Sequence, residues 1–251
     1  MKITGHWTLL ACQRIASVPM KPPGLLIAIC LVLCSAVAVV AQQSADVRDE
    51  FWPELVIYVP INEKYRLVFT GNVSRARETQ DSFEGQLGAH VDHFYSNRIT
   101  FRVGYRFGFS LGSNDRFREH RIVTEESLRK KIKSSILLTD RNRQDWRWVD
   151  GDFSFRYRNR LTAEKEFRLA NRRITPYGSA EIFYDTRFST FNRYRFASGI
   201  QIALRKFRSE EPLLLILRKE RVLDIYYLRQ LDTRSEPKHI NAIGVSFAIH
   251  F

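Results

Sequence analysis

The last thirteen residues of the sequence alternate strictly between large apolar side chains and small or polar ones. The apolar positions are Ile243, Val245, Phe247, Ile249 and Phe251. A period of two predicts a β-strand with one apolar face. That face needs an apolar neighbour, so the fold depends on what covers it.

The same alternation recurs along most of the chain after residue 41. The clearest example is Ile99–Leu111, where seven apolar side chains, four of them aromatic, alternate with Thr, Arg, Gly and Ser. Turn-forming residues such as Asp150-Gly151-Asp152 separate these segments, as in successive β-hairpins. The segments are longer than the usual strand of roughly 5–6 residues. They match the roughly 9–11 residues that a tilted strand needs to cross a bilayer.

The apolar faces could be covered by a second sheet, as in a soluble sandwich, or by lipid, as in a membrane barrel. Bacterial outer-membrane barrels commonly end on an aromatic strand, whereas the termini of soluble domains usually fray. We therefore predict an all-β fold, an antiparallel up-and-down transmembrane β-barrel in the outer membrane of a Gram-negative bacterium. We interpret Val245, Phe247, Ile249 and Phe251 as its C-terminal barrel-assembly signal.

The pattern shows that strands are present but does not by itself fix their number. We distinguish about eleven strand-like segments, but single-chain bacterial barrels have an even number. Either Phe51–Pro60 lies partly outside the wall, or Leu213–Leu217 is an additional strand. We expect about 10 to 12 strands.

A leader precedes the barrel. Residues 24–41 are apolar throughout and lie near the lower limit for a membrane helix of roughly 20 residues. We predict a secretory signal peptide over 1–41, with Met20 as an alternative start, and the barrel over 42–251. The three cysteines, Cys12, Cys30 and Cys34, all fall in the leader, so no disulfide is expected in the barrel.

The formal net charge of +13 suggests a nucleic-acid partner, but the placement of the arginines argues against one. They alternate with the aromatic residues instead of forming an exposed patch. An Arg or Lys on the lipid face costs roughly 2–4 kcal/mol at the bilayer midplane, so these residues should line the lumen. The expected lumen-lining residues are Arg102, Arg106, Glu119, Arg121, Arg141, Arg143, Asp145, Arg156, Arg158, Glu181, Arg193 and Arg195.

These charges allow two interpretations of the lumen, which is narrow in a barrel of this size. They could pair across strands and plug the lumen, giving a structural barrel. They could instead leave a constricted, porin-like path for small anionic solutes, because arginine binds carboxylates and phosphates in bidentate fashion.

Catalytic motifs are missing from the sequence. It contains no Gly-x-Ser-x-Gly elbow, no Gly-rich phosphate loop and no Cys-based metal spacing. His90 and His93 are three residues apart and cannot share a strand face, which argues against a two-histidine metal site. We therefore predict no enzymatic activity, cofactor or metal. The competing hypothesis is a membrane-embedded hydrolase acting on lipid or lipopolysaccharide and requiring His120 or His239; the other histidine of this part is His250.

Several motifs, in their order, resemble an uncharacterised bacterial outer-membrane β-barrel family, numbered 2490 among the domains of unknown function. The motifs are Glu119-His120-Arg121, Arg141 to Arg147, Pro176 with Glu181-Ile182-Phe183, Asn192 to Arg195, and Asp224 to Gln230. The run from Arg141 is similar to the family pattern Arg-x-Arg-x-Glu-x-Arg, with Asp145 in place of the Glu. The resemblance implies an outer-membrane barrel and no particular activity.

The expected partners follow from this location. They are outer-membrane lipid, the barrel-assembly machinery and periplasmic chaperones, and no nucleic acid. The oligomeric state stays open. Trp52, Trp146 and Trp148 are expected to anchor the wall at the membrane interface.

Overall fold

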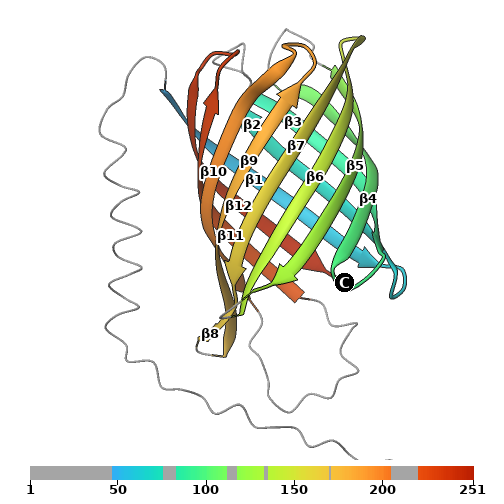
Figure 1. The fold of residues 1–251 in the computed structure, drawn as a ribbon, viewed down its shortest axis with the longest axis vertical. Helices are drawn as coiled ribbons and strands as arrows, with labels where there is room; N and C mark the ends of the chain where they lie inside the picture. Colours follow the sequence, from blue (N-terminus) through green and yellow to red (C-terminus); the bar gives the residue numbers. More distant parts are fainter. Residues whose placement is uncertain (1–46, 76–82, 112–117, 133–134, 170, 205–219) are drawn as a thin grey trace, which may run out of the picture. The chain divides into compact units, whose positions relative to one another are not determined.

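The computed structural model describes residues 47–75, 83–111, 118–132, 135–169, 171–204 and 220–251, whose strands form a closed β-barrel (Figure 1). The predicted signal peptide lies outside the described residues. No helix in the described part is long and apolar enough to cross a membrane. The wall strands are β1 (Val47–Pro60), β2 (Tyr65–Arg75), β3 (Phe83–Phe94), β4 (Ile99–Leu111), β5 (Arg118–Lys131), β6 (Ile136–Val149), β7 (Asp152–Lys165), β9 (Arg172–Asp185), β10 (Thr190–Ala203), β11 (Glu220–Asp232) and β12 (His239–His250). A three-residue strand, β8 (Phe167–Leu169), pairs with β9 beside the wall.

The closing pair of the barrel is parallel. Each wall strand pairs antiparallel with the next along the chain, and β1 and β12 then pair in parallel, from Val47 opposite His239 to Tyr58 opposite His250. An up-and-down order of eleven described wall strands leaves the first and the last pointing the same way, so they can only close in parallel. The predicted transmembrane barrel of 10 to 12 strands is confirmed; the prediction that it is antiparallel throughout is corrected at this one pair.

This closure also resolves the strand count. Phe51–Pro60 belongs to the wall as part of β1. The segment Leu213–Leu217 lies outside the described residues. The expectation of an even number fails because it assumed that both ends of the meander lie on the same side of the membrane.

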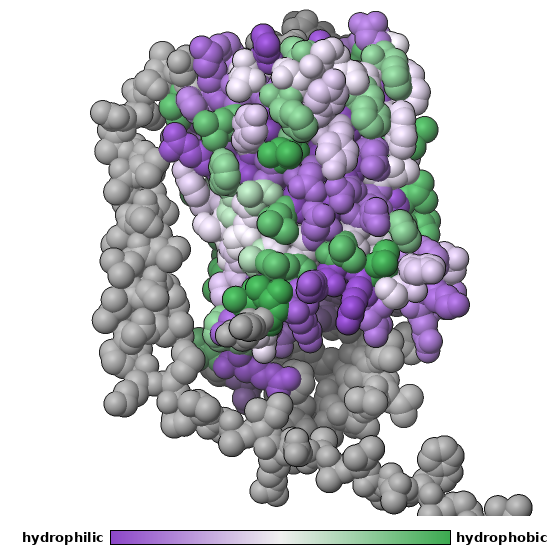
Figure 2. All heavy atoms as spheres, in the orientation of Figure 1, coloured by the Kyte–Doolittle hydropathy of each residue, from purple (hydrophilic) through white to green (hydrophobic). Residues whose placement is uncertain are grey.

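The two faces of the wall have the polarity of a membrane barrel. Phe51, Leu87 and Phe153 point outward and are more than half exposed, whereas Asp92 and Asp145 point inward and are fully buried. Hydrophobic side chains are accordingly visible on the outer surface (Figure 2). The described residues form no second sheet that could cover this outer face, so the sandwich alternative is excluded.

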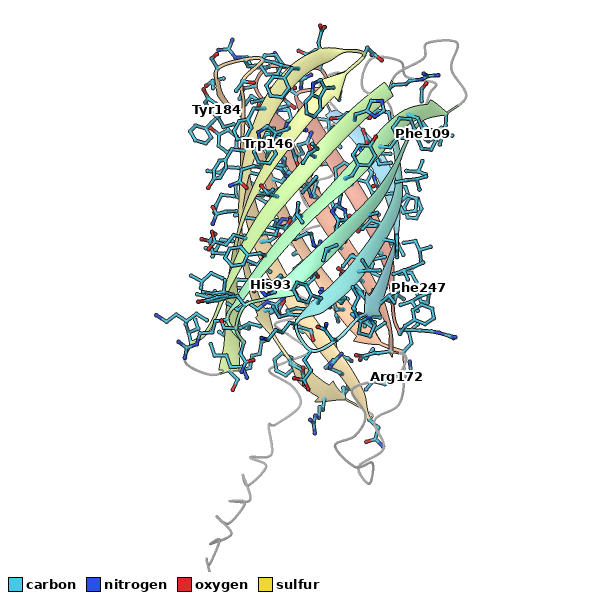
Figure 3. The ribbon with its side chains drawn as sticks, turned by 90° about the vertical axis from the view of Figure 1, so that its right-hand side faces the viewer. His93, Phe109, Trp146, Arg172, Tyr184 and Phe247 are labelled. Atoms are coloured by element: carbon cyan, nitrogen blue, oxygen red, sulfur yellow. The ribbon has the colours of Figure 1, made fainter. Side chains whose placement is uncertain are left out.

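Aromatic side chains gather toward both ends of the outer wall. Phe109, Trp146 and Tyr184 lie toward one end and His93 and Phe247 toward the other (Figure 3). Such belts are typical of the two membrane interfaces.

Trp52 is an exception to the predicted interface anchors. Its neighbour Phe51 takes the outward position, so period two turns the indole into the lumen. There its Nε1 donates to Glu50 Oε2 at 2.6 Å, and the Arg195 guanidinium lies 5.1 Å from the ring centroid. The prediction of an anchor was wrong at this position.

Candidate functional site

All twelve predicted lumen residues occupy the inward-facing parity of their strands. This follows from local geometry, because residues two apart on a strand point the same way. The motifs Glu119-x-Arg121 and Arg143-x-Asp145 therefore place a cation and a carboxylate side by side in the lumen. We call the charged groups of this face the lumenal network.

The centre of the network is built on β5 and β6. Arg121 Nη2 donates to Glu119 Oε2 at 2.7 Å, and Arg147 from β6 donates to the other oxygen. Arg143 Nε donates to Asp145 Oδ1 at 2.7 Å. Although Asp145 is shorter than the Glu of the family pattern, it still pairs with an arginine of its own strand.

Two acidic residues of β9 connect the arginines of β7 to the network. Glu181 receives hydrogen bonds from Arg158 at 2.8 Å and Arg160 at 3.0 Å. Asp185 receives one from Arg156 at 2.8 Å. Both carboxylates are almost completely buried, and buried charges need such partners because desolvation is costly.

Sequence reasoning missed some acids of the network. Asp92 of β3 is fully buried and receives Arg66 Nη2 and Arg102 Nε, each at 2.6 Å. Asp232 of β11 pairs with Arg193 at 2.7 Å. The position of Asp92 along its strand was the signal that could have found it, because Asp92 lies opposite the inward-facing Arg102 once β3 and β4 are in register.

The network does not fill the lumen. A cavity of about 520 Å³ remains. Twelve arginines and seven carboxylate side chains contribute to its lining, so the cavity has a basic wall. Both earlier interpretations, the plug and the anion path, refer to this space.

The outer wall carries a second set of polar residues, which the sequence reasoning also missed. Polar side chains face outward on β5, β6 and β7, where lipid is expected. We call them the wall cluster; they are Thr124, Glu126, Asp140, Asn142, Gln144, Tyr157 and Asn159. Figure 2 shows hydrophilic side chains among hydrophobic ones in the middle of this side of the barrel.

Hydrogen bonds connect most of the wall cluster. Asn159 Nδ2 donates to Asp140 Oδ1 at 2.7 Å and to Asn142 Oδ1 at 3.0 Å, and the Tyr157 hydroxyl donates to the same Asn142 oxygen at 2.5 Å. Thr124 Oγ1 donates to Gln144 Oε1 at 2.8 Å. A sequence signal existed: Asn142 and Gln144 alternate with the arginines of β6, where other strands have apolar residues.

A histidine and a tyrosine are paired on the same outer wall. His120 of β5 faces outward, and its Nδ1 lies 2.5 Å from the hydroxyl oxygen of Tyr105 on β4. The imidazole also packs on Phe107, with ring centroids 5.2 Å apart. His120 lies opposite Trp148 of β6 and near the start of its strand, at the level of an aromatic belt.

An apolar groove of about 360 Å³ runs along the outer face of β1 to β4. Gly71 and Gly85 leave it open, and Leu87 and Phe109 line it. Phe107 stacks on Phe109 with centroids 5.7 Å apart. The groove therefore ends one side chain away from His120.

The other histidines are distributed differently. His90 points into the lumen, where Arg106 Nε donates to its Nε2 at 3.4 Å, while His93 faces outward and stacks on Tyr65 at 4.8 Å. His239 and His250 begin and end β12. In the described part of the chain, no three His, Cys, Asp or Glu residues are grouped so that they could hold a metal ion.

Comparison with solved structures finds a similar fold. LpxR from Salmonella typhimurium matches with a TM-score of 0.51 and 8% sequence identity, over 84% of this chain and 92% of that chain. At this identity the likeness concerns the fold. LpxR is an outer-membrane enzyme, a lipid A deacylase. This corrects our prediction of no enzymatic activity, which rested on the absence of known catalytic motifs: a barrel of similar fold is an enzyme.

Comparison of sequences gives the family. No curated protein matches this sequence. The family model described as "Protein of unknown function (DUF2490)" matches residues 49–239, which include every motif on which the family resemblance was based. As its motifs predict, the chain belongs to this family, DUF2490.

Proposed function

We propose that this barrel lies in the outer membrane and hydrolyses an acyl ester of a membrane lipid at its outer wall. The observation that carries the proposal is the His120–Tyr105 hydrogen bond, on the lipid-facing side and at the end of an apolar groove. The fold that the chain shares with the enzyme LpxR supports it.

The depth of the pair suits this substrate class. The ester groups of membrane lipids lie between the head groups and the acyl chains, which is the level where interfacial aromatic residues gather. His120 lies at that level, beside Phe107 and opposite Trp148. An acyl chain held in the groove would leave its ester close to the imidazole.

The chemistry needs a base and a group that stabilises negative charge. In the tautomer that is protonated at Nδ1, His120 donates to the Tyr105 oxygen and keeps a free lone pair on Nε2. Nε2 takes a proton from water, the water oxygen bonds to the ester carbon, and the Tyr105 hydroxyl donates to the developing oxyanion. The ester C–O bond then breaks, and the alkoxide takes the proton from Nε2.

The wall cluster gives independent support for a site on this wall. Ionisable residues that face hydrocarbon are costly and mark function by default. Glu126 lies on β5, which also carries His120, and Asp140 lies on the neighbouring strand β6. We infer that the cluster holds the polar part of a ligand on the outer face of β5 to β7.

The test is release of fatty acid by the refolded full-length barrel from phospholipid vesicles and, separately, from lipopolysaccharide. We expect release from at least one of them, and an about 100-fold or greater loss in H120Q. H93Q is the matched control, because His93 also faces outward and also contacts a tyrosine. Release that is absent from both lipids, or equal in H120Q and the wild type, would contradict the proposal.

A second candidate function is passive transport of small anions, favoured by the basic lining of the lumenal cavity. Planar-bilayer conductance of the refolded barrel tests it. Anion-selective steps would support it. A sealed bilayer under varied salts would instead favour a lumen plugged by ion pairs.

A further inference from the structure

We propose that the lumen contains a binding site for the phosphate or carboxylate group of a small solute, centred on Arg106 of β4. This site lies inside the barrel, on the other face of the wall from His120. It can therefore exist whether or not the barrel cleaves lipids or conducts ions.

Arg106 differs from its neighbours in the lumenal network. Within the described residues it has no ion-pair partner, and its recorded contact is the 3.4 Å hydrogen bond from Nε to His90 Nε2. His90 is itself buried and fixes the direction of the guanidinium. The contact uses Nε, so the two terminal nitrogens of Arg106 stay available.

The register places like charges beside Arg106. It lies directly opposite Arg121 on β5, which in turn lies opposite Arg147 on β6. Like charges directly opposite one another destabilise a sheet. Glu119 compensates Arg121 and Arg147, whereas no carboxylate of the described residues lies within ion-pair distance of Arg106.

A second arginine contributes an unused donor. Arg143 is 4% exposed, and its Nη2 is buried without a hydrogen-bond partner among the described residues. Arg106, Arg121 and Arg143 all line the 520 Å³ cavity. Buried donors normally have partners, so the unused donor of Arg143 adds to the positive charge beside Arg106.

The geometry indicates the class of ligand. Guanidinium groups bind the paired oxygens of carboxylates and phosphates through two parallel hydrogen bonds. The cavity volume lies within the roughly 300–1,000 Å³ of small-molecule sites. A small solute with one such group would bind the terminal nitrogens of Arg106, in the basic wall that Arg121 and Arg143 share.

Calorimetric titration of the refolded full-length barrel with inorganic phosphate and, in a second arm, acetate tests the site at constant ionic strength. We expect saturable binding of at least one anion and at least a tenfold weaker affinity in R106Q. R102Q is the charge-matched control: it also removes one lumenal arginine, but Arg102 is paired with Asp92. R102Q should retain the wild-type affinity.

A second measurement covers the case in which R106Q folds poorly. R106K keeps the charge and loses the bidentate fork, so it should bind more weakly than the wild type. The bound anion should also raise the unfolding temperature of the wild type and of R102Q, but not that of R106K to the same extent. Absence of saturable binding to both anions, or equal affinity in the wild type and the Arg106 variants, would overturn the proposal.

Discussion

Arg143 and Asp145, two residues apart on β6, are joined inside the barrel by a 2.7 Å hydrogen bond from Nε to Oδ1. The strand itself brings the pair together, since period two points both side chains into the lumen. Arg121 from β5 approaches the other Asp145 oxygen at 3.8 Å. The pair thus connects a local sequence motif to the network that fills much of the lumen.

Loss of this carboxylate should destabilise the barrel. D145N leaves the buried guanidinium of Arg143 without its charge partner, and breaking a buried pair costs about 3–5 kcal/mol. Urea unfolding of the barrel in vesicles, followed by tryptophan fluorescence, measures the change. D152N, at an exposed position near the β6–β7 turn, should leave the unfolding free energy unchanged. Equal stability of D145N and the wild type would show that the pair is not stabilising.

The Tyr105 hydroxyl should matter for lipid cleavage. Y105F keeps the ring and removes the group that holds His120 and faces the oxyanion, so we expect a loss of about 100-fold in turnover. Y65F, which alters the tyrosine beside His93, is the control and should retain activity. If Y105F and Y65F behave alike, Tyr105 has no role in catalysis.

Filling the apolar groove should discriminate between substrates by chain length. A Cβ at Gly71 would meet Leu87 at an ordinary contact distance of 3.5 Å, so G71L fits the wall but occupies groove space. We expect about tenfold slower release of long acyl chains and little change for short ones. G178L adds the same side chain to the outer face of β9, away from the groove, and should change neither rate. A uniform effect on all chain lengths would show that the groove does not bind the acyl chain.

The parallel closure predicts a specific cross-linking pattern. Phe51 lies opposite Ile243 and Leu55 opposite Phe247. In a parallel pair both F51C/I243C and L55C/F247C should form disulfides on oxidation, whereas an antiparallel pair permits only one of the two. Gel mobility without reductant measures this, with L55C/I243C as the mismatched control. Cross-linking of only one matched pair would contradict the parallel register.

The β6–β7 hairpin shows which elements the local sequence determines. The turn residues Asp150 and Gly151 have φ angles of 51° and 100°, which Asp-Gly pairs adopt with little strain. The strands on either side follow from the alternation of Phe153 and Phe155 with Ser154 and the arginines. Elements of this kind are predictable because their causes lie within a few residues.

The outer wall shows where local reasoning stops. Tyr105 and His120 are 15 residues apart, and only the register of β4 and β5 places them together. Treating the outward parity as uniformly apolar also hid the wall cluster, which forms only when three strands align Thr124, Gln144 and Tyr157 in one row.

The sequence by itself determined the polarity of the two faces, because the direction of a side chain on a strand depends only on its parity. It thereby determined that the arginines point inward and that the fold is a membrane barrel. The tertiary structure decided how the ring closes and which charges meet. It also placed a histidine next to a groove, and among the described residues it left Arg106 without an ion-pair partner. These outcomes depend on the alignment of strands that are distant in sequence, which no local pattern encodes.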